Sequence, residues 1–125
     1  MSITGKPLIW IGSTLKDLRA FPEEVKDVMG FALSVAQSGG KHPDAKPLKG
    51  YKGAGVLEVV DDFDGDTYRA VYTVKLEGVV YALHAFQKKS KTGKATDKTD
   101  LEMIDRRLKL AREDHNERKR ENDNG

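Results

Sequence analysis

A run of lysines directly after a short apolar segment is the part of this sequence best suited to chemistry. Lysines stand at positions 88, 89, 91, 94 and 98 after the segment 79–86, and Asp97 is the only acid between Phe86 and Thr99. The apolar segment predicts a half-buried strand. Ammonium groups gathered at a strand end create a field that attracts anions. The segment therefore predicts a surface that binds phosphate groups.

Two further residues could complete a site for RNA cleavage. Attack by the RNA's own 2′-hydroxyl needs a proton acceptor, a cation at the phosphate and a proton donor for the leaving 5′-oxygen. An imidazole can act as proton acceptor or as proton donor near neutral pH, and a guanidinium can bind a phosphate through two parallel hydrogen bonds. The predicted catalytic residues are Arg69, His84, Lys88 and Lys89.

Four other lysines are predicted to hold the RNA backbone as mobile point charges. Two of them, Lys49 and Lys52, lie on the polar segment that leads into the predicted sheet, and the other two, Lys91 and Lys94, lie in the lysine run. Tyr51 lies between the first two.

Each of these residues also has a structural interpretation. His84 on a strand is more often a hydrogen-bonded core residue than a catalyst, and Arg69 could pair with Glu58 across the sheet. Lysine runs are usually solvated loops, and they also protect a sheet edge. The residue types alone therefore predict an anion-binding surface and go no further.

Composition restricts the other possibilities. The 125 residues include no Cys, which excludes disulfides, zinc–cysteine sites and thiol catalysis. His42, His84 and His115 stand in dissimilar contexts, so we predict no metal and no cofactor. The acidic stretch 61–66 lacks the calcium-loop ligand pattern. Neither a membrane-spanning run nor a signal-peptide core is present in the sequence, so we expect a cytoplasmic protein without membrane contacts.

Periodicity predicts the order βααβββα. Strands are expected at 8–12, 56–60, 67–75 and 79–86, the last three forming an antiparallel meander. Capping boxes at Thr14–Asp17 and Thr99–Glu102 and a proline start at Pro22 predict three helices. An apolar stripe over 25–36 predicts that the second helix packs on something flat. The segment 41–53 is expected to be a loop.

These elements predict an α+β fold, with a small antiparallel sheet, an N-terminal helical hairpin on one face and a C-terminal helix nearby. Residues 1–111 should form a single domain. Residues 112–125 have no apolar residue to bury, and we expect them to be a charged, flexible tail.

Four segments resemble the RelE/ParE toxin superfamily, and more closely its phage-derived HigB-like branch. The similarity runs from about residue 8 to 111 and rests on Leu48–Gly50, Gly55–Val59, Tyr68–Tyr72 and Leu83–Lys91. The resemblance implies the toxin of a type II toxin–antitoxin system, a ribosome-dependent endoribonuclease that cleaves mRNA and inhibits translation. It also implies a helix-turn-helix (HigA-like) antitoxin partner in a hetero-oligomer. By position, Arg69 corresponds to the mid-strand arginine that acts on the scissile phosphate.

The sequence departs from that family at two places. Val59 follows Glu58 where many members carry an arginine, and the tail contains no tyrosine, only His115. Two alternatives therefore stay open: a ParE-like inhibitor of DNA gyrase without catalysis, and a non-toxic phage-derived module that binds nucleic acid or protein.

Overall fold

The computed structural model describes residues 5–124 except 52, 54 and 89–95, and confirms an α+β fold. In chain order its elements are β1 (Leu8–Trp10), α1 (Thr14–Arg19), α2 (Glu23–Gln37), β2 (Ala45–Pro47), β3 (Val56–Phe63), β4 (Asp66–Thr73), β5 (Val80–Lys88) and α3 (Lys98–Asn124).

The strands form one five-stranded sheet in the order β1-β5-β4-β3-β2. The antiparallel meander β3–β4–β5 is as predicted. However, β1 pairs in parallel with β5, so the sheet that was predicted to be antiparallel is mixed. The stretch predicted as a loop also contains β2, an edge strand that ends in Pro47, and prolines are tolerated at sheet edges.

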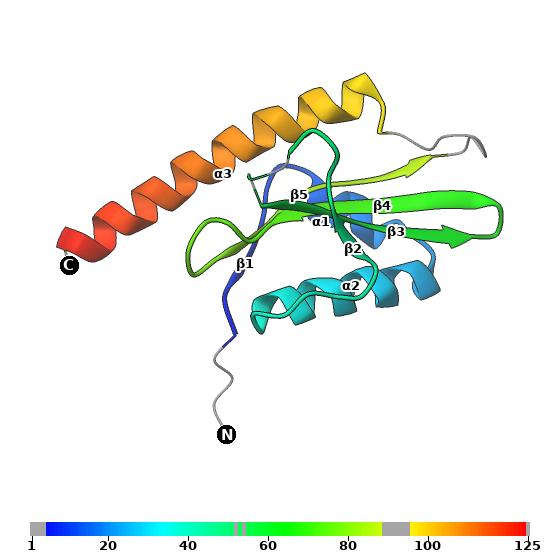
Figure 1. The fold of residues 1–125 in the computed structure, drawn as a ribbon, viewed down its shortest axis with the longest axis horizontal. Helices are drawn as coiled ribbons and strands as arrows, with labels where there is room; N and C mark the ends of the chain where they lie inside the picture. The colour runs from blue at the N-terminus through cyan, green and yellow to red at the C-terminus, as the bar shows by residue number, and fades with distance from the viewer. Residues whose placement is uncertain (1–4, 52, 54, 89–95, 125) are drawn as a thin grey trace.

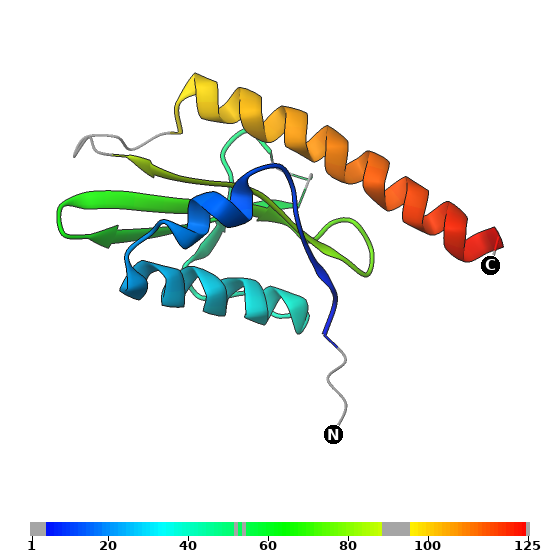
Figure 2. The same ribbon diagram turned by 180° about the vertical axis from the view of Figure 1, so that it is seen from behind.

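The two faces of the sheet carry separate hydrophobic clusters. Helix α2 covers one face and α3 crosses the other (Figure 1, and from behind in Figure 2). Side chains of β4 alternate as predicted: Tyr68, Ala70 and Tyr72 pack in the α2 cluster, whereas Val71 packs in the α3 cluster. The predicted stripe of α2 is also confirmed, with Met29 fully buried at its centre.

The turn between β3 and β4 is shorter than predicted. Only Asp64 and Gly65 lie outside the strands, and both have positive φ (52° and 86°). Two such residues make the tight turn that matches the twist of a hairpin. Strand β3 therefore continues to Phe63 instead of ending at Val60.

The starts of the first two helices differ slightly from the capping prediction. The cap of α1 is Ser13, whose hydroxyl donates to Asp17 Oδ2 at 2.7 Å, whereas the Thr14 hydroxyl donates to the Ile11 carbonyl at 2.7 Å. Pro22 is the cap of α2 and not its first helical residue.

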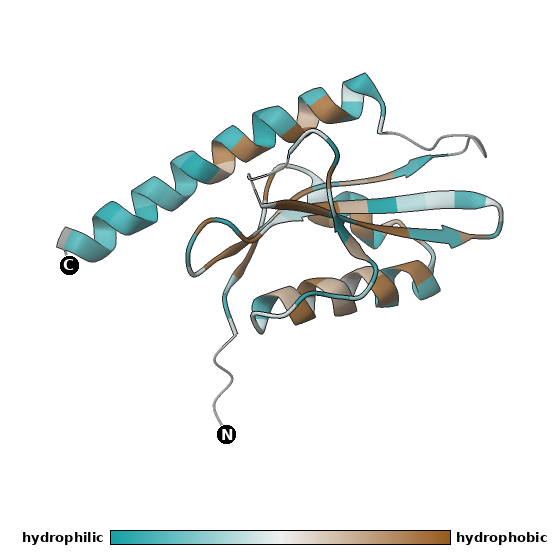
Figure 3. Ribbon diagram, viewed as in Figure 1, coloured by the Kyte–Doolittle hydropathy of each residue, from teal (hydrophilic) through white to brown (hydrophobic). Residues whose placement is uncertain are grey.

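Helix α3 runs on to Asn124 instead of fraying after Ala111. Its C-terminal half is hydrophilic on every visible side (Figure 3). It contacts β5 through Asp114, which accepts a hydrogen bond from the Tyr81 hydroxyl at 2.6 Å, and the turn between β4 and β5 through His115, whose Nε2 lies 2.8 Å from the Glu77 carbonyl oxygen. None of the helices in the described ranges has the length and apolar character that a membrane span requires.

We predict that Gly55→Ala destabilises the fold. Gly55 has φ +68°, and a Cβ there would lie 2.5 Å from Lys75 Cβ. Strain of this kind costs on the order of 1–3 kcal/mol. The matched control is Gly30→Ala, because Gly30 lies within α2 with open space around it and alanine favours a helix by about 0.5–1 kcal/mol. Urea unfolding measures both changes, and equal stability of the two variants would contradict the prediction.

Candidate functional site

A β-bulge in β5 decides which side chains meet above the sheet. Val71 of β4 pairs with His84, but the next residue, Tyr72, pairs with Ala82. Leu83 is therefore the extra residue of a bulge, which shifts the alternation of the strand by one position. Beyond the bulge, His84 points to the same face as Val71.

The register places three predicted catalytic residues on this face. Arg69 pairs with Phe86, and Lys88 pairs with Thr67. Directly opposed residues point to the same side of a sheet, as do residues two apart on one strand. Arg69, His84 and Lys88 thus share the face that α3 crosses.

Arg69 is buried and paired. Its Nη1 donates to Glu58 Oε1 at 2.8 Å, and the side chain is only 6% exposed. This is the cross-sheet pair that the sequence allowed as the structural alternative. A guanidinium held in this way has a fixed orientation, which suits a cation that must meet a phosphate in one geometry.

Both ring nitrogens of His84 face protein groups. Nε2 lies 2.8 Å from Asp100 Oδ1, and Nδ1 lies 3.4 Å from Arg107 Nη1. Because a guanidinium only donates, the network assigns the ring proton to Nε2, which donates to Asp100. Phe86 stacks on the ring with centroids 4.6 Å apart. His84 can therefore exchange a proton with a substrate only after one of these contacts opens.

Arg107 is the residue of this network that sequence reasoning missed. Its Nη1 donates to the Leu83 carbonyl at 3.0 Å and to Thr14 Oγ1 at 3.1 Å, and its Nη2 donates to Ser13 Oγ at 3.0 Å. Burial lowers its pKa below the usual arginine value. Gly12 leaves room for this side chain, since a Cβ there would lie 2.9 Å from its Nε.

The sequence did contain a signal for this network. Asp100, Ile104, Arg107 and Ala111 follow one another at spacings of four, three and four, which places all four on one side of a helix. Ile104 and Ala111 are the apolar residues of this side and are fully buried, so polar residues at the same spacing were candidates for buried contacts with the sheet.

Lys88 at the end of β5 is also paired with an acid. Its Nζ lies 2.7 Å from Asp97 Oδ1, just before the first residue of α3. Acids are favoured at a helix start, where unpaired N–H groups carry partial positive charge. Asp97 and Asp100 thus connect the beginning of α3 to β5.

The loop that carries Lys49 is held against α3. The Tyr51 hydroxyl donates to the Asp105 carboxylate and lies 3.4 Å from the Leu101 carbonyl oxygen. Burial, together with the hydrogen bond to Asp105, raises the pKa of Tyr51 to about 12. Lys49 itself is exposed.

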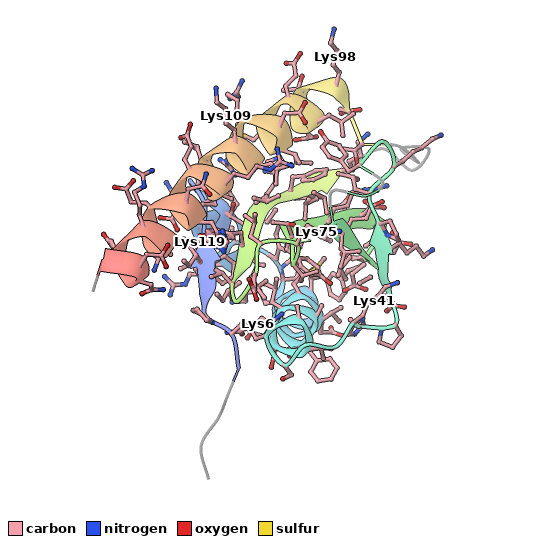
Figure 4. The ribbon with its side chains drawn as sticks, turned by 60° about the vertical axis from the view of Figure 1, so that its left-hand side comes forward. Lys6, Lys41, Lys75, Lys98, Lys109 and Lys119 are labelled. Atoms are coloured by element: carbon pink, nitrogen blue, oxygen red, sulfur yellow. The ribbon has the colours of Figure 1, made fainter. Side chains whose placement is uncertain are left out.

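The remaining predicted lysines, Lys52, Lys89, Lys91 and Lys94, lie outside the described residues. The lysines labelled in Figure 4 are dispersed over the molecule and do not form one patch; Lys98 and Lys109 extend from α3 away from the sheet. The shared face of β4 and β5 is therefore where the structure brings candidate residues together.

The cavity that the described residues form lies away from this face. A cavity of about 410 Å³ lies between the β4–β5 turn and the end of α3, and its charged lining residues are Glu77, His115, Arg118, Lys119 and Glu121. Within the described ranges, no group of three His, Asp or Glu side chains could hold a metal ion.

Comparison with known proteins gives a family. The model of the family described as phage-derived protein Gp49-like (DUF891) matches residues 16–109, which confirms the phage-derived resemblance. No curated protein matches the chain.

Two solved structures resemble the fold. An arginine-to-alanine double mutant of the Escherichia coli toxin RelE in the free state is 18% identical, with a TM-score of 0.47 over 65% of this chain and 81% of that one. The Mycobacterium tuberculosis toxin–antitoxin complex RelBE2 is 20% identical, with a TM-score of 0.44 over 71% of this chain and 98% of that one.

We predict that Arg107→Ala destabilises the protein by about 3 kcal/mol, because it leaves buried acceptors unsatisfied, each costing about 1–3 kcal/mol. The matched control is Arg106→Ala, an exposed neighbour on the same helix whose removal should stay within about 0.5 kcal/mol. Urea unfolding gives both values, and amide exchange in β5 locates the loss. Equal stabilities would show that the Arg107 contacts contribute nothing.

Alkaline pH should loosen the Tyr51 contact. The folded-state pKa near 12 lies above the ordinary tyrosine value of 10, so the contact contributes fully below pH 10 and is lost as pH rises through 12. The unfolding free energy of the wild type should therefore fall relative to that of Tyr51→Phe between pH 10 and 12. Parallel pH curves for the two proteins would contradict this assignment.

Proposed function

The chain belongs to the phage-derived Gp49-like family, and we propose that it is the toxin of a type II toxin–antitoxin system that cleaves mRNA on the ribosome. The observation that carries the proposal is the register of β4 and β5, which gathers Arg69, His84 and Lys88 on one face. The segments that resemble the RelE/ParE superfamily contribute all three residues.

In the proposed reaction, Arg69 stabilises the crowded phosphorus centre while the 2′-hydroxyl attacks and the 5′-oxygen leaves. The products are a 2′,3′-cyclic phosphate and a 5′-hydroxyl. Lys88 and Lys89 add positive charge beside the scissile phosphate. Lys49, Lys52, Lys91 and Lys94 hold the flanking backbone, where lysines act as mobile charges.

His84 is the proposed proton carrier, and its surroundings set a condition. Nε2 must separate from Asp100 before it can reach a substrate oxygen. Binding of RNA against β5 would supply that opening, because the substrate competes for the same cationic surface.

The proposed partners are a helix-turn-helix antitoxin of the HigA-like kind, in a hetero-oligomer with this chain, and the ribosome with its mRNA. The proposal places the protein in the cytoplasm, where both partners act. The resemblance of the sequence to the HigB-like branch supports the identity of the antitoxin.

One observation favours a second function, inhibition of DNA gyrase by binding alone. Arg69, His84 and Lys88 each have a carboxylate partner. A face whose basic side chains already have acidic partners can serve as a binding surface without performing acid–base chemistry. Induction of the DNA-damage response with intact mRNA would favour this function over RNA cleavage.

We predict that Arg69→Ala reduces mRNA cleavage by about 10²–10³-fold, the loss typical when a group that stabilises the developing charge is removed. Expression without antitoxin, with mapping of new mRNA 5′ ends and of growth arrest, measures the effect. Arg69→Lys should restore little, because an ammonium lacks the planar fork.

Glu58→Gln is the matched control for folding at this position. It disrupts the same ion pair from the other side but keeps the guanidinium. We expect it to stay toxic, and circular dichroism should show both variants folded. A folded Arg69→Ala protein that still arrests growth and cleaves mRNA would overturn the active-site assignment.

A further inference from the structure

On the shared face, the acid of every pair is more exposed to solvent than the basic side chain that it contacts. The side-chain exposures are 6% for Arg69 against 16% for Glu58, and 9% for His84 against 23% for Asp100. The difference is largest in the third pair, in which Lys88 is 11% exposed and Asp97 is 65% exposed. A ligand that approaches this face from solvent therefore meets carboxylates before it meets the cations.

We propose that Asp97 occupies the position an RNA phosphate takes at Lys88, so that RNA binding here exchanges one anion for another. This inference rests on the proposed function, because it concerns the same RNA-binding face. Asp100 stands in the same relation to His84 Nε2. The two acids thereby limit how tightly the face holds RNA.

The chemistry of the two anions is interchangeable at this position. Carboxylate and phosphate oxygens both accept charge-assisted hydrogen bonds from an ammonium group, and the Lys88 Nζ–Asp97 Oδ1 distance of 2.7 Å is typical of such a bond. A phosphate oxygen at the same distance would replace Oδ1 without any change in Lys88.

Release of the carboxylate should also be easy. The Asp97 side chain is already largely hydrated, so its return to water requires little further change in solvation. Its main-chain carbonyl accepts the Leu101 N–H at 2.9 Å, which keeps the start of α3 in place while the side chain moves.

The competing interpretation is that Asp97 only stabilises the start of α3. The substitution Asp97→Asn distinguishes this interpretation from our proposal, because asparagine caps a helix start as well as aspartate does but carries no charge. A purely structural acid would leave RNA affinity unchanged on this substitution. Glu102→Gln is the matched control, since it removes one exposed charge from the first turns of the same helix.

The experiment measures binding of a fluorescent single-stranded RNA whose sugars are all 2′-O-methylated, so that it cannot be cleaved. Anisotropy titrations at several NaCl concentrations give the Kd and its salt dependence for the wild type, Asp97→Asn and Glu102→Gln. Exposed ion pairs are worth up to about 1 kcal/mol, so we expect the Kd of Asp97→Asn to be about three- to fivefold lower. Glu102→Gln should change the Kd by less than about twofold.

Salt dependence gives a sharper test than affinity. When RNA binds the wild type, counterions leave the phosphates. The Asp97 carboxylate, once freed from Lys88, attracts counterions in turn and offsets that release. Without that carboxylate, contact with Lys88 releases counterions uncompensated, so the slope of log K against log salt should steepen by about 0.7. The gain in RNA affinity should disappear in the double variant Asp97→Asn/Lys88→Gln, because Asp97 and Lys88 act on the same phosphate.

Equal affinities and slopes for the wild type and Asp97→Asn would overturn the inference, as would an absence of RNA binding by all variants. A gain that persists without Lys88 would also overturn it, since that gain would come from net charge alone. Tighter, Lys88-dependent binding by Asp97→Asn together with intact mRNA in cells would support this inference and reject the proposed cleavage reaction. The two proposals can therefore fail separately.

Discussion

The buried guanidinium of Arg107 is the interaction on which the arrangement of the site depends. It joins α3 to the Leu83 carbonyl at the bulge of β5 and to the hydroxyls of Ser13 and Thr14 at the start of α1. An arginine can satisfy several acceptors at once because its donors point in fixed directions. The same group faces His84 and so helps to fix the ring toward Asp100. One side chain thus sets the position of α3, the bulge in β5 and the orientation of the His84 ring.

Alternation and periodicity predicted those parts of the fold that depend on local pattern. The two faces of β4 and the buried stripe of α2 followed from spacing alone, because one face of each element must be apolar. The parallel pairing of β1 with β5 and the presence of β2 did not follow, because each depends on segments far apart in the chain. Strands β1 and β2 have three residues each, which is too few for an alternation of apolar and polar residues to be recognised.

The site was predictable only in part for a related reason. The sequence identified Arg69, His84 and Lys88 as candidates, but simple alternation along β5 would have put His84 on the same side as Ala82. The pairing of Arg69 with Phe86 puts His84 on the face of Arg69, and the bulge at Leu83 leaves Ala82 on the opposite face. Nothing in the sequence of β5 marks the bulge, because the group that holds its carbonyl is Arg107, 24 residues later. Glu58 was expected as a partner of Arg69, but the contacts of Asp97 with Lys88 and of Asp100 with His84 join β5 to the region of α3 and were not predicted.

The three contacts between an acid and a basic side chain reconcile a stable sheet with a face that is rich in basic residues. Arg69 and Lys88 carry like charges on one face, and burial beneath α3 takes hydration from both. A carboxylate beside each cation offsets both costs, and because the acids are the more exposed partners, they can be replaced from the solvent side. A negatively charged ligand that displaces them restores the balance of charge that the fold requires. On our proposal, the arrangement that stabilises the free protein therefore also sets the charge of the ligand that binds this face.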